Sequence, residues 1–133
     1  MKLEGRRIYK GKAIGEALVT SQAISFYGGV DPETGEVVEK DHELEGQSVS
    51  GKVLVFPNGK GSTVGPYILY QLAKADPPRA PTAIINAECE AIVAVGAIIS
   101  EIPCVDKIDL SKIKTGDKVE VDAENGIVTI LEK

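Results

Sequence analysis

The chain has 133 residues, of which 43% are hydrophobic and 26% are charged, and its formal net charge is −5 at pH 7. This length fits one domain around one core, and this composition excludes a disordered or fibrous protein. Lysines and arginines are scattered among acidic residues, so no basic stretch offers a surface for nucleic acid. We therefore expect one domain, residues 1–133, that does not bind nucleic acid.

Neither a targeting segment nor a membrane span is evident. Residues 1–4 lack the apolar segment of a signal peptide, and the longest apolar run, residues 91–99, has about half the length that a bilayer requires. We expect a cytoplasmic protein with no membrane partner. The two cysteines, Cys89 and Cys104, are too few for a disulfide framework or for a metal site supplied by this chain alone. We interpret them as small, half-buried thiols.

The N-terminal part combines strand and loop signals. Residues 6–19 mix β-branched and small residues with Gly11 and Gly15, which predicts strands separated by a bend or bulge. Residues 27–36 (YGGVDPETGE) are dense in turn-forming residues and are interpreted as a surface loop. The single histidine, His42, stands between two acidic residues, and we interpret it as a surface residue rather than a catalytic base.

A strand followed by a helix is predicted in the middle of the chain. Residues 51–56 (GKVLVF) form a short apolar run with β-type residues, which favours a buried strand. Val64, Ile68 and Leu72 then recur at helical spacing up to the two prolines at residues 77–78. This order of strand, tight loop and helix makes the intervening loop a candidate binding site.

The C-terminal half repeats this order and ends in a hairpin. Residues 82–86 are predicted as a strand, residues 88–100 as a short helix weakened by Gly96, and residues 103–105 as a further strand. Two β-rich runs then flank Asn125-Gly126, which is the strongest short hairpin signal. The pattern as a whole predicts an α/β fold with two main helices.

The loop between the first predicted strand and helix is the candidate site. Gly59 and Gly61 flank Lys60, so the backbone can approach a ligand closely. Ser62 or Thr63 is predicted to cap the following helix, whose first N–H groups would favour a negative charge.

The residues of this loop do not by themselves decide its chemistry. The order Gly59-Lys60-Gly61-Ser62 is shorter than the nucleotide-binding P-loop and differs from it, so that motif is excluded. A structural cap, an anion site and a catalytic hydroxyl remain as interpretations. A serine alone is a weak nucleophile and a weak base, and no activating histidine is evident. The hydroxyl therefore indicates either plain binding or a site that another chain completes.

Three segments in this order resemble the aconitase X family. They are residues 26–31 (FYGGVD), 55–63 (VFPNGKGST) and 90–103 (EAIVAVGAIISEIP), and the resemblance runs nearly end to end. It implies a swivelling β/β/α domain with a β-rich, barrel-like core and two main helices. It also implies that this domain is the small subunit of a heterodimeric hydro-lyase, docked on a large subunit that holds a 4Fe–4S cluster. No cofactor or metal would be bound by this chain alone.

The resemblance also implies a reaction and the role of one residue. The enzyme would remove water from mevalonate 5-phosphate to give trans-anhydromevalonate 5-phosphate, a step of a modified mevalonate pathway to isoprenoids. Ser62 would accept the proton. From the residues of the loop we expect Gly59, Lys60, Gly61 and Thr63 to contact the substrate, a phosphorylated hydroxy acid, and a solvated surface lysine is the alternative interpretation of Lys60.

One departure from the pattern and several alternatives accompany this interpretation. Ordinary aconitases have an arginine shortly after the corresponding serine, whereas here the next arginine is Arg79, so cationic groups would have to come from the partner. A non-catalytic anion-binding or scaffold module and a dehydratase subunit for another hydroxy acid remain as alternatives. The C-terminal half also resembles swivelling phosphohistidine domains, but no histidine follows His42, which argues against phosphotransfer.

Overall fold

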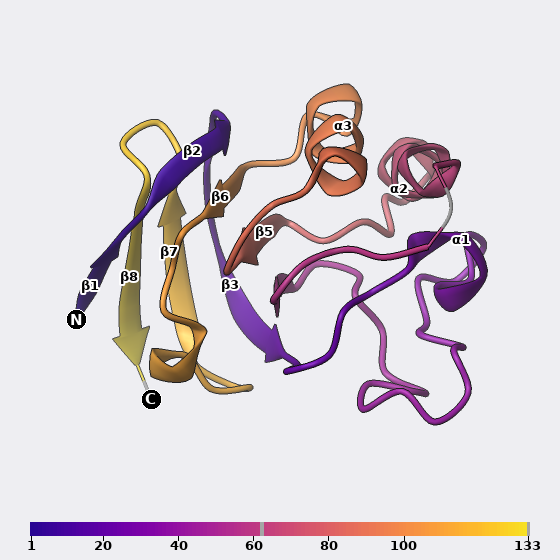
Figure 1. Cartoon of the computed structure of the whole chain (residues 1–133), viewed down its shortest axis with the longest axis horizontal. Coiled ribbons are helices and arrows are strands. Elements are labelled where there is room, and N and C mark those ends of the chain that lie inside the picture. The colour runs from indigo at the N-terminus through magenta and orange to yellow at the C-terminus, as the bar shows by residue number, and fades with distance from the viewer. Residues whose placement is uncertain (62, 133) are drawn as a thin grey trace.

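The computed structural model describes residues 1–61 and 63–132 and has the α/β architecture that the sequence predicts (Figure 1). Ser62 and Lys133 lie outside the described residues. In the described part, eight strands form one sheet in the order β1-β8-β7-β3-β4-β5-β6-β2. The strands are β1 (Lys2–Glu4), β2 (Arg6–Tyr9), β3 (Lys12–Val19), β4 (Val53–Phe56), β5 (Ala83–Asn86), β6 (Cys104–Asp106), β7 (Lys118–Asp122) and β8 (Ile127–Glu132). The helices are α1 (Phe26–Gly29), α2 (Gly65–Lys74), α3 (Ala91–Ser100) and the short 3-10 helix η1 (Leu110–Lys112).

The predicted strand and helix pattern is confirmed in both halves of the chain. β4 and α2 form the first predicted unit, and β5, α3 and β6 form the second, with β4, β5 and β6 parallel to one another. β7 and β8 form the predicted antiparallel hairpin. α3 begins at Ala91 rather than at residue 88, because the Glu90 carboxylate accepts hydrogen bonds of 2.9 Å from the N–H groups of Ile92 and Val93.

The two ends of the strand order are formed by one continuous stretch of chain. β1 pairs with β8 at one end, and β2 pairs with β6 at the other. Only Gly5 separates β1 from β2, so this segment brings the two edges together and produces the predicted barrel-like core. A side chain at Gly5 would clash with the main-chain oxygen of Asp106 and with Ile108. The close approach of two backbones therefore requires glycine at this position.

Alternation along the parallel strands divides the core into two layers. In β4, Val53 and Val55 pack into the barrel-side cluster, whereas Leu54 and Phe56 pack against the helices. The barrel-side cluster includes residues of β7 and β8, and the helix-side cluster includes residues of α2 and α3. Figure 1 shows α2 and α3 on the side of the parallel strands away from β7 and β8. The β/β/α layering expected for a swivelling domain is thus confirmed.

Gly96, which weakens the helix prediction locally, lies at the contact between α2 and α3. A Cβ atom at Gly96 would lie 3.0 Å from Leu69 Cδ2 and 3.4 Å from Pro66 Cα. The helices therefore approach each other closely where α3 has no side chain. Packing against α2 explains why a glycine is tolerated inside this helix.

Two interpretations of the N-terminal half are wrong, and a third is confirmed at one of its two glycines. His42 is buried rather than on the surface, because its Nε2 lies 3.1 Å from the Ala23 carbonyl oxygen and its Nδ1 accepts a 3.0 Å hydrogen bond from the Leu44 N–H. Residues 27–36 are not simply a surface loop, since they include the end of α1 and the buried Val30. The predicted strands β2 and β3 are separated around Gly11, which has a φ of +126°, whereas Gly15 lies within β3.

The helices of residues 1–61 and 63–132 are short beside the roughly 20 residues that a bilayer requires. Each of them is too short or too polar to span one.

Arg6 and Asp106 join β2 to β6 at one end of the strand order. Arg6 donates from Nε to Asp106 Oδ1 at 3.0 Å and from Nη2 to Oδ2 at 2.7 Å, and the Cys89 N–H donates to Oδ2 at 2.8 Å. The Asp106 side chain is fully buried. Burial alone would raise the pKa of its carboxyl, but the hydrogen bonds from Arg6 and Cys89 hold that pKa below its ordinary value. The folded state therefore favours the ionised form of Asp106.

Replacing Arg6 with methionine removes the charge that compensates this buried carboxylate. We expect the free energy of unfolding at pH 7 to fall by about 2 kcal/mol. Because the folded pKa is depressed, the pair stabilises the fold above the unfolded pKa of about 3.9, and this stabilisation is lost as the pH falls through the folded pKa. The difference between Arg6→Met and the wild type, measured by urea unfolding, should therefore shrink at about pH 3.

Arg7→Met is the matched control, because Arg7 is an exposed arginine on the same strand. An equal loss for both variants, or a loss at Arg6 that does not change with pH, would contradict the role of the pair.

Candidate functional site

The loop between β4 and α2 is held against the segment that precedes α1. The Ile24 N–H donates to the Asn58 carbonyl oxygen at 3.2 Å, and the Lys60 N–H donates to the Ile24 carbonyl oxygen at 3.0 Å. These bonds form an isolated parallel bridge between Ile24 and Gly59. The loop therefore starts as an extension of β4, with a fixed backbone up to Lys60.

Both glycines of the loop allow close contacts that larger residues would prevent. A Cβ atom at Gly59 would lie 2.5 Å from Val93 Cγ2 and 2.6 Å from Glu90 Oε1, so the loop contacts the start of α3. Gly61 has a φ of +89°, and a Cβ atom there would lie 2.5 Å from Ser25 Oγ. That Ser25 hydroxyl donates to the Tyr27 carbonyl oxygen at 2.8 Å. The close neighbours of both glycines are protein atoms, so packing requires glycine at these positions, and close approach of a ligand stays a prediction.

The helix cap differs from the predicted one. Val64 occupies the N-cap position of α2, so Thr63 precedes the cap and is exposed. Pro66 lies in the first turn, as predicted. Ser62, the predicted proton acceptor, lies outside the described residues, between Gly61 and Thr63.

Lys60 is half-exposed and forms an ion pair of 2.8 Å between its Nζ and Glu39 Oε2. Glu39 comes from the long segment between α1 and β4, 21 residues before Lys60. An ion pair with this exposure contributes little to stability, but it limits the directions in which the ammonium group points. The Lys60 side chain is therefore held in place by Glu39, a partner that the sequence pattern did not reveal.

An open pocket of about 310 Å³ lies beside the loop. It brings together two of the segments that carry the family resemblance, residues 26–31 and 55–63. Gly59 and Thr63 do not line this pocket, whereas Lys60 and Gly61 do. Its lining residues are Ser25, Tyr27, Gly28, Gly29, Glu39, Lys60 and Gly61. Among them, Lys60 carries the positive charge and Glu39 the negative charge.

The cysteines lie away from this pocket, and Cys104 is completely buried while Cys89 is half-buried. A hydrogen bond with Cys89, together with burial, raises the pKa of the Cys104 thiol well above its ordinary value. Cys104 therefore stays protonated at neutral pH. Among the residues that the structure describes, no group of three or more His, Cys, Asp and Glu side chains could hold a metal ion.

The comparison with family models decides the classification. A model of the aconitase X swivel domain matches residues 2–130. The chain belongs to the aconitase X family. The swivelling fold implied by the three sequence segments is thereby confirmed for this aconitase X swivel domain.

Individual relatives are similar over nearly the whole length of this aconitase X chain. A protein of Thermococcus kodakarensis named phosphomevalonate dehydratase small subunit is 59% identical over 132 residues, which cover 99% of this chain and 98% of that one. A protein of Thermococcus onnurineus with the same name is 54% identical, with 99% and 100% covered. The crystal structure of Thermococcus kodakaraensis aconitase X in its holo-form matches with a TM-score of 0.95 at 57% identity, covering 99% of each chain.

Replacing Gly61 with alanine tests the packing of the aconitase X loop. The substitution strains a positive φ and places a methyl group against Ser25, so we expect the free energy of unfolding to fall by about 2 kcal/mol. Gly46→Ala is the control, because Gly46 has a φ of +87° with open space around it. Gly46→Ala should lower the free energy of unfolding only through the strained backbone, by about 1 kcal/mol. Equal losses in urea unfolding would show that the Ser25 contact does not constrain the loop.

Proposed function

We propose that this chain is the small subunit of a phosphomevalonate dehydratase, a hydro-lyase that converts mevalonate 5-phosphate to trans-anhydromevalonate 5-phosphate in a modified mevalonate pathway. The observation that carries the proposal is similarity over the full chain to relatives of that name, at 53–59% identity. We further propose that residues 1–133 act as one swivelling domain in the cytoplasm.

We propose Ser62 as the proton acceptor. Dehydration breaks a C–H bond beside the substrate carboxylate and a C–O bond on the next carbon, so a base must take the proton while the hydroxyl group leaves as water. Ser62 directly follows Gly61, which lines the pocket, and it precedes the start of α2. The free N–H groups at the start of a helix favour negative charge by about 0.3–1 kcal/mol. Negative charge that develops on a substrate beside the start of α2 would be favoured in the same way.

We propose that Gly59, Lys60, Gly61 and Thr63 contact the substrate. The phosphate and the carboxylate of a phosphorylated hydroxy acid are both anionic, and Lys60 is the cation that lines the pocket. Its pairing with Glu39 keeps the ammonium group beside Gly61. Arg79 is not an alternative at this site, because it lines a different pocket, on the outer side of α2. Lys60 thus offers one positive charge at the pocket, and further cationic groups would come from the partner.

We propose that the partner is a large subunit in a heterodimer and that it carries a 4Fe–4S cluster. The cysteines described here do not fit as ligands of that cluster, because Cys104 is buried in the helix-side core and contacts Cys89. Iron–sulfur clusters are held by thiolates that can reach the iron. The contribution of this chain would then be the loop that contains Ser62.

Anaerobic co-purification with the large subunit of the same source tests the proposed function directly. We expect a stable pair that contains iron and sulfide and dehydrates mevalonate 5-phosphate, whereas either subunit alone is inactive. A chain that retains no iron–sulfur partner, or a pair without dehydratase activity, would contradict the proposal.

Within that pair, Ser62→Ala should lower kcat by at least about 100-fold while the complex still assembles, because a general base contributes a factor of this size. Assembly is measured by gel filtration and turnover by product formation. Ser50→Ala is the matched control, since Ser50 precedes β4 at the end opposite the loop. Near-normal turnover of Ser62→Ala would assign the loop to binding alone.

Lys60→Met should raise KM for mevalonate 5-phosphate by about tenfold with a smaller effect on kcat, because it removes a charge that binds the substrate anion. Lys52→Met is the control, since Lys52 forms a comparable ion pair of 2.6 Å with Glu16 near the start of β4. Steady-state kinetics of the two complexes measure the difference. An unchanged KM for Lys60→Met would remove Lys60 from the binding site.

A further inference from the structure

Exposed apolar side chains gather on the outer sides of α2 and α3. α3 has no charged residue between Ala91 and Ser100, and it exposes Val95, Ile98 and Ile99 at 47%, 48% and 38%. A surface helix normally carries polar side chains on its outer face, whereas a helix that is apolar all round is covered. We name the following set the outer helix face: Tyr67, Tyr70, Val95, Ile98 and Ile99.

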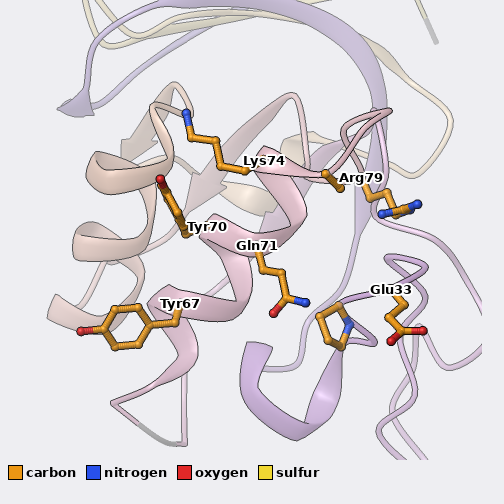
Figure 2. A pocket seen from close by; sticks show the side chains of 8 residues that line it. Glu33, Tyr67, Tyr70, Gln71, Lys74 and Arg79 are labelled. Atoms are coloured by element: carbon orange, nitrogen blue, oxygen red, sulfur yellow. The ribbon is translucent and has the colours of Figure 1, made fainter.

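The two helices contribute to one continuous surface. Gly96 of α3 approaches Pro66 and Leu69 of α2, and Lys74 lies 3.9 Å from the Glu101 carboxylate at the far end of both helices. Figure 2 shows Tyr67, Tyr70, Gln71 and Lys74 on the outward side of α2, where they line one pocket. The Lys74 ammonium lies 5.5 Å from the centre of the Tyr70 ring. The aromatic residues of α2 therefore lie next to α3, with a charged pair at the edge.

This surface begins at the candidate site. A Cβ atom at Gly65 would lie 3.4 Å from Ile92 of α3 and 3.9 Å from the backbone nitrogen of Tyr27, which lines the site pocket. Tyr67 is the next exposed residue, and its N–H donates to the Val64 carbonyl oxygen at 3.0 Å. A molecule that covers the loop from outside therefore meets the outer helix face as well.

The exposed apolar side chain of Ile14 lies in a different setting. Ile14 is 54% exposed on β3, but the residues exposed on the same face of that strand are Lys12 and Glu16. Single exposed apolar residues of this kind are normal in soluble proteins. Apolar residues on two adjacent helices, rimmed by charge and including two tyrosines, have the composition of the centre of a protein interface.

We infer that the outer helix face is the docking surface for the large subunit, an inference that rests on the proposed function. The choice of occupant follows from the position of the face beside the loop that contains Ser62. One partner covers the apolar surface and at the same time reaches the pocket, as a site shared between two subunits requires. A second copy of this chain on the same face would place another small subunit over the loop and block the larger partner.

Introducing a negative charge into the outer helix face tests this inference. Val95→Glu and Ile99→Glu place a carboxylate in the centre of the face, and Ile14→Glu makes the same change at an exposed apolar position on β3. Thermal unfolding of each full chain checks that it folds, and calorimetric titration with the purified large subunit gives Kd. We expect the two face variants to bind at least about tenfold more weakly and Ile14→Glu to bind like the wild type.

The outcomes separate this inference from the proposed function. If the wild-type pair is active and Val95→Glu and Ile99→Glu bind as tightly as the wild type, the docking surface lies elsewhere and the function stands. If the wild-type chain does not bind the large subunit, both proposals fail. If the wild-type chain forms a homodimer that the two face variants disrupt, a second copy occupies the face and the inference is overturned.

Discussion

One stretch of backbone connects the first strand of the sheet order to the last, and the rest of the fold depends on it. β1 and β2 follow each other through Gly5, yet they pair with strands at opposite ends of the order. The backbones approach so closely that no side chain fits at Gly5, and the next residue, Arg6, neutralises the buried Asp106. The barrel-like arrangement surrounds the barrel-side core and leaves the opposite face of the parallel strands for two helices.

The location of the candidate site follows from this layering. A loop connects the parallel strand β4 to α2, and this loop is hydrogen-bonded to the segment around Ile24. Ligand sites of parallel sheets lie beyond the carboxyl ends of the strands, since loops from different parts of the chain meet there. Here the loop with Lys60 meets the glycine-rich segment of α1 and the acidic side chain of Glu39. A rigid scaffold thus presents a site whose residues come from three separate segments.

Local patterns in the sequence predict those elements whose structure depends on nearby residues. Val53 to Phe56 form a strand because both faces of β4 are buried, and the hairpin of β7 and β8 follows from its turn at Gly126. His42 and Glu39 could not be placed in this way. His42 is buried by the segment around Ala23, and Glu39 reaches Lys60 across 21 residues. The N-cap at Val64 was missed because cap propensity favours the hydroxyl residues that precede it.

The hydrogen bond between the Cys89 N–H and Asp106 has a consequence for the motions of the loop. Asp106 lies in β6 and pairs with Arg6 of β2. Glu90, the residue after Cys89, caps α3 and lies against Gly59. A short path of contacts therefore leads from Arg6 to the candidate site. Segments connected in this way open together during partial unfolding, and their amide hydrogens exchange with solvent at similar rates. We therefore expect the amide hydrogens of the first half of the loop to exchange slowly, as those of a pre-organised surface would.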